Sequence, residues 1–121
     1  MTDKELLELA AKAANLPECG WMGPAFMYVK DNTFTEWNPL TDDGDALRLA
    51  VKLGLSVTIG YDVNGTEVVC AMKFKDRKKS ESSIITFFKQ KDDACIEIIK
   101  DNPYANTRRA IVRMAAEIGA E

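Results

Sequence analysis

Residues 37–54 constrain the fold of this chain more than any other segment. They begin with an aromatic-Asn-Pro turn, continue through an acidic cluster, and end with a helical repeat of apolar residues that stops at Gly54. Carboxylates stabilise the positive end of a helix, and either Thr41 or Asp42 can cap it. Glycine readily takes the left-handed conformation that follows a last helical turn. The segment therefore predicts one short amphipathic helix whose apolar stripe faces a core.

Two further segments carry helix signals. Thr2 starts a Thr-Asp-Lys-Glu capping box, and apolar residues then follow helical spacing over residues 3–15, until Pro17 intervenes. Towards the other end of the chain, Asn102 precedes a proline at the first helical position, and Gly119 is placed to stop that helix. The sequence therefore predicts three amphipathic helices.

The stretches between these helices alternate as strands do. Residues 26–29 and 33–37 flank an Asp-Asn pair and predict a hairpin, whereas residues 19–24 resemble a loop. Residues 55–61 place four apolar side chains on one face, which indicates a half-buried strand. Those four residues are Leu55, Val57, Ile59 and Tyr61.

A second hairpin is predicted at Asn64-Gly65, because both residues tolerate the positive φ of a tight turn. Residues 66–74 should then pair back antiparallel, and residues 84–88 indicate another strand. Residues 94–99 are compatible with a strand or a short helix, of which we prefer the strand.

The composition is that of one globular domain. The chain has 121 residues, of which 46% are apolar and 29% charged, and this length is sufficient for a modest core of its own. We therefore predict a single domain over residues 1–121 with an α+β fold. In it, an antiparallel sheet of about four to six strands is covered by three helices, in the order helix, hairpin, helix, strands, helix.

Histidine is absent from the chain, which excludes Ser-His-Asp and Cys-His catalysis and His-ligated zinc. The acidic cluster at Asp42 resembles the start of a calcium loop, but Leu53 stands where the closing glutamate belongs. Phosphate-binding and dinucleotide-binding glycine patterns are also missing. We expect a non-enzymatic protein without cofactor or metal; an enzyme that uses carboxylates such as Asp42, Asp43 or Asp45 is a less favoured alternative.

The chain contains three cysteines, and no two of them have metal-ligand spacing. An odd count favours reduced thiols in a cytosolic protein. The first residues lack the pattern of a secretory signal, and the apolar runs are shorter than a membrane span. We therefore expect a cytoplasmic protein that does not insert into a membrane. The cysteines are Cys19, Cys70 and Cys95.

Two basic groups and two aromatic residues are candidates for partner binding. The net charge of -3 argues against a general nucleic-acid binder, but local basic patches can still bind phosphate or an acidic protein surface. Such residues can equally be solvated, and the aromatic residues can equally fill the core or serve as binding hot spots. The basic loop comprises Lys73, Lys75, Arg77, Lys78 and Lys79; the last helix contributes Arg108, Arg109 and Arg113; the aromatic pair is Trp21 and Tyr28.

Three blocks taken together, residues 1–14, 37–54 and 102–119, resemble a family of small phage and prophage proteins described as a phage alpha-beta-alpha sandwich domain. The resemblance implies a sheet covered by helices, a temperate-phage or prophage origin and a bacterial host cell. The family has no established activity, so it transfers no functional residues. Residues 55–99 lie outside the resemblance, and the loops of that region are where a specific partner would be recognised.

We therefore predict a phage accessory protein that binds a host or phage macromolecule. An inhibitor of a host defence system, of the anti-CRISPR kind, is a concrete version of this hypothesis. The alternative is a nucleic-acid-binding regulator that uses the 73–79 loop together with the arginines of the last helix. A homodimer formed through exposed sheet edges remains open.

Overall fold

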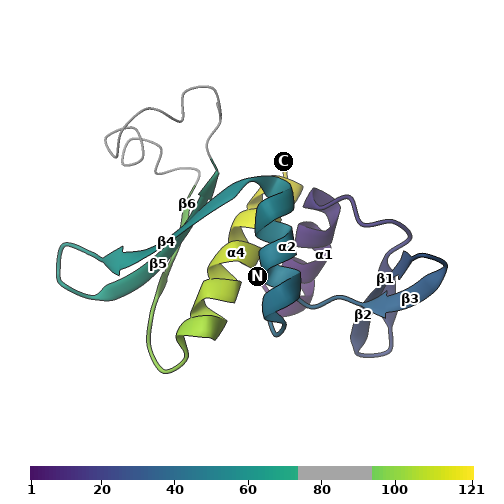
Figure 1. Cartoon of the computed structure of the whole chain (residues 1–121), viewed down its shortest axis with the longest axis horizontal. Helices are drawn as coiled ribbons and strands as arrows, with labels where there is room; N and C mark the ends of the chain where they lie inside the picture. Colours follow the sequence, from purple (N-terminus) through teal and green to yellow (C-terminus); the bar gives the residue numbers. More distant parts are fainter. Residues whose placement is uncertain (74–93) are drawn as a thin grey trace.

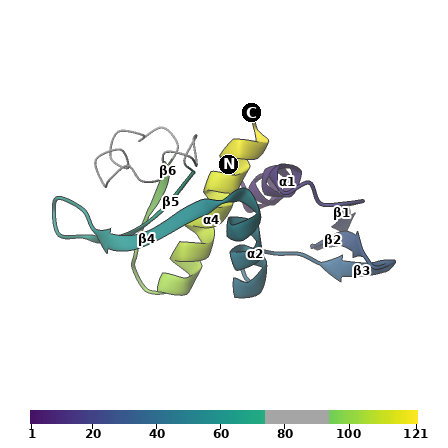
Figure 2. The ribbon, with the colours of Figure 1, turned by 45° about the horizontal axis from the view of Figure 1, so that its top comes forward.

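A computed structural model describes residues 1–73 and 94–121 and has the predicted α+β class (Figure 1). The six strands in these residues form two three-stranded antiparallel sheets rather than one. The helices form a layer between them, with β1–β3 on one side and β4–β6 on the other (Figures 1 and 2). The elements are α1 (Asp3–Ala13), β1 (Gly20–Met22), β2 (Ala25–Lys30), β3 (Thr33–Glu36), α2 (Asp43–Leu53), β4 (Leu55–Tyr61), β5 (Glu67–Lys73), β6 (Ala94–Ile98) and α4 (Pro103–Gly119).

The three helices begin where the sequence predicts. Each N-cap side chain accepts a hydrogen bond from the backbone N–H three residues later: Thr2 at 3.1 Å, Asp42 at 2.7 Å and Asn102 at 3.1 Å. These bonds satisfy N–H groups that have no partner inside the helix. Asp42, not Thr41, is therefore the cap of α2. Gly54 ends that helix in the left-handed conformation, with φ of 68°, as predicted.

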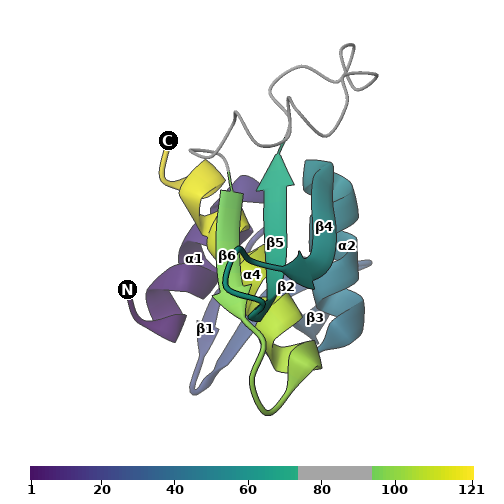
Figure 3. The same cartoon turned by 90° about the vertical axis from the view of Figure 1, so that its left-hand side faces the viewer.

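One apolar core joins the helical layer to both sheets. Leu49 of α2 and Ile111 of α4 belong to the same buried cluster, together with Val69 of β5 and Trp37 after β3. The β4–β6 sheet lies against α4 on one face, and its three strands run side by side in Figure 3. The predicted strand at 94–99 is confirmed as β6, whereas the predicted strand at 84–88 lies outside the described residues.

The segment at residues 19–24 was predicted to be a loop, and this prediction is wrong. Residues 20–22 form β1, which pairs antiparallel with β2 so that Trp21 lies opposite Phe26. The strand has only three residues, too few to show an alternation in sequence. The predicted hairpin of β2 and β3 is confirmed, and its Asp31-Asn32 turn has positive φ at both residues.

The second hairpin forms at the predicted place but with a different turn. Of its turn residues, Gly65 has a positive φ of 78°, whereas Asn64 does not adopt this conformation. The N–H of Gly65 donates to the carbonyl of Asp62 at 3.0 Å, and Asp62 pairs with Thr66. This is a three-residue connection with glycine in the left-handed position, which is the next most common hairpin after the two-residue turn.

The predicted burial of the β4 face is only partly correct. Leu55 packs against the core, but Val57, Ile59 and Tyr61 are exposed. The reason is that the β4–β5 hairpin extends beyond the helical layer (Figure 1). The alternation therefore identifies the strand and the face correctly, while the extent of burial depends on where the helices end.

Gly119 was predicted to stop the last helix, but its role is different. It is the last residue of α4, and the following residue Ala120 keeps right-handed helical geometry. A Cβ atom at this position would overlap the backbone oxygen of Leu9 and lie 2.8 Å from its carbonyl carbon. Glycine is required because α1 and α4 approach so closely here. The buried faces of both helices are rich in alanine, which permits the same close approach along their length.

Replacing Gly119 with alanine should therefore destabilise the protein, although alanine is normally the better helix former. We expect a loss of about 3 kcal/mol in the free energy of unfolding, because the backbones of α1 and α4 must separate. Gly20→Ala is the matched control, since a Cβ atom there meets nothing within 4 Å. Denaturant unfolding measures both. Equal stability of the two variants would contradict the close helix contact.

Candidate functional site

The β1–β3 sheet has one face turned towards the core. Trp21, Phe26 and Trp37 share this face, because Trp21 pairs with Phe26 and the N–H of Trp37 donates to the carbonyl of Phe26 at 2.9 Å. The ring centroids of Trp21 and Phe26 are 5.1 Å apart in an edge-to-face arrangement, and those of Phe26 and Trp37 are 5.9 Å apart. These ring contacts join β1, β2 and the residue after β3 on the inner face of the sheet. Phe26 and Trp37 also belong to the buried cluster that contains residues of all three helices, so this face is attached to the helical layer.

The two aromatic candidates, Trp21 and Tyr28, are half-buried on this inner side and pack against the core. The Trp21 indole Nε1 donates a 2.8 Å hydrogen bond to the Glu8 carboxylate of α1. The Lys4 ammonium lies 5.4 Å from the Trp21 ring centroid, within the range of a cation–π interaction. Trp21 therefore attaches the sheet to α1, and its polar end is already paired within the protomer.

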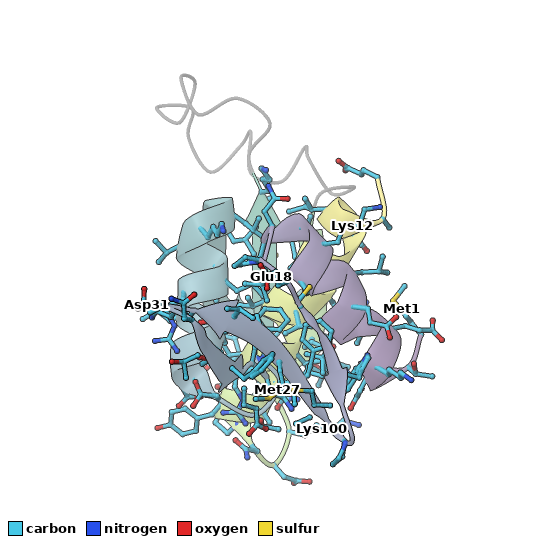
Figure 4. All side chains as sticks on the ribbon, turned by 90° about the vertical axis from the view of Figure 1, so that its right-hand side faces the viewer. Met1, Lys12, Glu18, Met27, Asp31 and Lys100 are labelled. Carbon is cyan, nitrogen blue, oxygen red and sulfur yellow. The ribbon has the colours of Figure 1, made fainter. Side chains whose placement is uncertain are left out.

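The opposite face of the same sheet points away from the helices and carries large apolar side chains. Strand alternation places Met27 and Val29 on the other side from Phe26 and Tyr28. Phe34 pairs with Val29 and is 64% exposed, and Met22 is 52% exposed. We refer to these four residues, Met22, Met27, Val29 and Phe34, as the Met-Phe face. Figure 4 looks onto this side of the sheet, with Met27 labelled.

A shallow hollow of about 170 Å³ lies at one end of the Met-Phe face. Methionine side chains are flexible and adapt their shape to a partner, and an exposed phenylalanine adds a large apolar contact area, so such a hollow suits protein recognition. Two exposed carboxylates border the apolar side chains: Glu18 lines the hollow, and Glu36 pairs with Met27 on the same face of the sheet. The hollow is lined by Glu18, Cys19, Gly20, Trp21, Met22, Met27 and Phe34.

The structure places the predicted candidates Trp21 and Tyr28 on the inner face of the sheet, and their role in partner binding stays a prediction. Trp21 and Tyr28 are candidates because large side chains that are partly exposed can serve as binding hot spots, whereas Met22 and Phe34 of the same sheet are the more exposed residues. The alternation of residues 33–37 separates Phe34 from Trp37 and is a signal that could have identified Phe34. Met22 gave no comparable signal, since β1 was not predicted.

The arginines of α4 do not form one basic strip. Arg108 donates from Nε to the Leu40 carbonyl at 2.8 Å and from Nη1 to Asp43 at 2.6 Å. These bonds connect α4 to the turn before α2 and to the first turn of α2. The Arg108 side chain is only 16% exposed, so its role is structural.

Arg109 and Arg113 lie together on a different side of α4. Arg109 pairs with Asp3 at 3.0 Å, and Arg113 pairs with Glu97 of β6 at 3.0 Å. Glu97 also lies 3.6 Å from Arg109, so this carboxylate is shared by both arginines. They border a hollow of about 420 Å³ that contains charges of both signs. Paired carboxylates reduce the attraction for phosphate, so this cluster mainly ties α1 and β6 to α4.

The basic loop is described only at its first residue. Lys73 is half-buried at the end of β5, opposite Leu55, while Lys75, Arg77, Lys78 and Lys79 lie outside the described residues. Whether this loop joins the α4 arginines in one anion-binding surface therefore stays a prediction.

The cysteines differ sharply in their surroundings. Cys95 is buried against α4, and burial raises the pKa of its thiol to about 12, with a further contribution from the nearby Glu117. Burial also raises the pKa of Cys70. Cys19 is exposed at the hollow of the Met-Phe face. Within residues 1–73 and 94–121, no group of three or more cysteine or carboxylate side chains is arranged to hold a metal ion.

Comparison with known proteins identifies no family model, no curated protein and no solved structure that matches the chain. The resemblance to the phage alpha-beta-alpha sandwich domain therefore stays a prediction. Among the helices that the structure describes, none combines the length and the apolar character needed to cross a membrane.

Removing the Arg108 side chain should destabilise the contact between α4 and α2. Arg108→Ala is expected to lower the free energy of unfolding by about 1–2 kcal/mol, because the partly buried hydrogen bond to the Leu40 carbonyl is lost. Arg48→Ala should have a smaller effect, since Arg48 is 68% exposed and pairs with Asp45 of its own helix. Thermal unfolding of both variants provides the measurement. A larger effect at Arg48 would contradict this assignment.

The thiols should react in the order Cys19, then Cys70, then Cys95. Alkylation requires the thiolate, and a raised pKa together with burial suppresses this form at neutral pH. Brief treatment of the native protein with iodoacetamide, followed by peptide mass spectrometry, should find modification mainly at Cys19. Unfolding in denaturant should make all three equally reactive. Early labelling of Cys95 in the native state would contradict its burial.

Proposed function

We propose that this chain is a non-enzymatic phage or prophage accessory protein that acts by binding another protein through the Met-Phe face. The observation that carries this proposal is an apolar, largely exposed sheet face whose reverse side is fixed to the core by Trp21, Phe26 and Trp37. Contiguous apolar surface on a small protein is typical of an interaction site. A rigid support lowers the entropy lost when such a surface binds.

The chemistry of the partner follows from the composition of this surface. Met22 supplies an adaptable apolar contact and Phe34 a rigid aromatic one, and together they suit an apolar protrusion on the partner. Glu18 and Glu36 border those contacts, so lysine or arginine side chains on the partner would complement them. The overall charge of -3 favours the same kind of partner. We therefore propose a protein partner whose binding surface combines an apolar centre with a basic rim.

The biological setting is proposed from the resemblance of the three helical blocks, which form α1, α2 and α4. In a phage-infected or lysogenic bacterium, the partner would be a host or phage protein in the cytoplasm. The specific function that we favour is inhibition of a host defence system, because an inhibitor can act by binding a defence protein and blocking its activity, without catalysis of its own. Nucleic-acid binding is less favoured, since Arg108, Arg109 and Arg113 already pair with carboxylates of the protomer.

The Met-Phe face can be tested with one pair of substitutions. Phe34→Ser removes a 64% exposed aromatic side chain from this face, and Tyr104→Ser removes a 68% exposed aromatic side chain from the first turn of α4. Tagged protein would be used to capture partners from bacterial lysate, and the affinity for the captured protein would then be measured. We expect Phe34→Ser to weaken binding by about 30-fold, the effect of a hot-spot residue, and Tyr104→Ser to leave it unchanged.

In a parallel assay, each variant would be expressed in bacteria that carry a defence system, and the number of plaques that a phage forms on these cells would be counted. Protection of the phage by the original chain and by Tyr104→Ser, but not by Phe34→Ser, would support the proposal. Equal binding by both variants, or loss of binding only in Tyr104→Ser, would contradict the assignment of the Met-Phe face. Capture of nucleic acid but no protein would favour the alternative function.

A further inference from the structure

The outer edge of β4 is suited to pairing with a strand of another molecule. Within residues 1–73 and 94–121, the sheet order β4-β5-β6 leaves β4 at an edge. The N–H of Asp62 donates towards β5 to the Thr66 carbonyl at 2.9 Å. Because main-chain groups alternate in direction along an antiparallel strand, those of Val57, Ile59 and Tyr61 point away from β5.

As far as the described residues show, β4 itself carries none of the usual sequence features that prevent pairing at an edge. Natural edge strands carry charged residues, prolines or bulges that prevent contact with another strand. The seven residues of β4 contain no charge and no proline, and they pair with β5 in continuous register. Ile59 is 59% exposed and Tyr61 is 73% exposed. An uncharged edge of this length with exposed apolar side chains is a template for strand addition.

A second apolar surface lies beside this edge, on α2. Leu47 and Val51 are one helical turn apart, and they are 64% and 71% exposed. Asp45 of the same helix accepts a hydrogen bond from the N–H of Asn38, which follows β3, at 3.0 Å. The flank of α2 that carries Asp45 therefore faces the β1–β3 sheet. Helical periodicity then places Leu47 and Val51 on the flank that faces away from the β1–β3 sheet. β4 follows α2 directly in the chain and extends to the side opposite the β1–β3 sheet (Figure 1).

We propose that two copies of this chain pair antiparallel along β4, so that their β4–β6 sheets join into one continuous sheet. A two-fold axis perpendicular to the sheet at Ile59 places Ile59 opposite Ile59 of the second copy and Val57 opposite the second copy's Tyr61. Both pairs are apolar, and a β-branched residue opposite an aromatic one is a favourable cross-strand pair. The absence of charge in β4 means that no like charges meet across the axis.

The same two-fold axis would give the β4–β5 hairpin, which extends beyond the helical layer of its own copy, a helix of the second copy to pack against. Antiparallel pairing places the beginning of each β4 next to the end of the other, so that the α2 of one copy stands beside the exposed hairpin of the other. Leu47 and Val51 of one copy would then cover Ile59 and Tyr61 of the second. The pairing would cover five apolar side chains that are 37% to 73% exposed in one copy, namely Leu47, Val51, Val57, Ile59 and Tyr61. Burying them on both copies would give an interface on the order of 1,000 Å² in total, which is the size of the smaller specific interfaces. The Met-Phe face lies at the opposite end of the molecule and stays free (Figure 1).

Sedimentation velocity of the full chain, from low to high micromolar concentration, tests this pairing. We expect a reversible dimer that Ile59→Lys weakens by at least about tenfold, because a lysine on each copy would meet its like across the axis. Ile96→Lys is the matched control: Ile96 is 57% exposed, lies in the same sheet and belongs to β6. Circular dichroism should show that both variants keep the fold, and Tyr61→Lys provides an independent disruption of the same interface.

Amide hydrogen exchange followed by NMR locates the interface. The N–H groups of Val57, Ile59 and Tyr61 should exchange rapidly in dilute solution and become protected as the concentration rises. A chain that stays monomeric at high concentration would overturn the proposal. So would a dimer that survives Ile59→Lys but is lost in Ile96→Lys, because the contact would then involve β6. Neither result would bear on binding by the Met-Phe face, which the Phe34→Ser variant tests separately.

Discussion

The close contact between α1 and α4 is the constraint on which the rest of the structure depends. At Gly119 the two helices approach so closely that a Cβ atom would overlap the Leu9 carbonyl. Alanines such as Ala10 and Ala115, both fully buried, allow the same proximity further along the helices. α4 also contacts α2, β5 and β6, so this one helix connects the helical layer to the larger sheet. The smaller sheet is held from the other side by its aromatic residues and by the Trp21–Glu8 hydrogen bond.

The helix ends and most of the strands could be predicted because their signals are local. Asp42, Asn102 and Gly54 act through atoms within a few residues, and such contacts are encoded in short sequence patterns. The division into two sheets was not predictable, because alternation does not say which strands become neighbours. Gly119 was misinterpreted for a similar reason, since its requirement arises from a helix that lies more than a hundred residues earlier in the chain.

The same limit applies to the candidate site: local sequence patterns locate the segment, but the tertiary fold decides which of its side chains are exposed. The sequence identified an apolar, aromatic segment, but strand register decides that Trp21 faces the core while Met22 and Phe34 face outwards. The arginines of α4 were grouped because they are close in sequence. Arg108 instead pairs with Asp43 of α2, and Arg113 pairs with Glu97 of β6. Only the fold could show that these charges belong to structural contacts on two sides of the helix.

The proposed binding face exists only if the β1–β3 sheet buries its aromatic face and exposes the face that carries Met22 and Met27. The chain contains five methionines, and their methyl groups can be observed individually by NMR. A soluble paramagnetic agent should broaden the methyl signal of Met22, which is 52% exposed, and leave that of Met114, which is 4% exposed, nearly unchanged. Met27 should show an intermediate effect. Equal protection of Met22 and Met114 would contradict the orientation of this sheet and, with it, the proposed binding face.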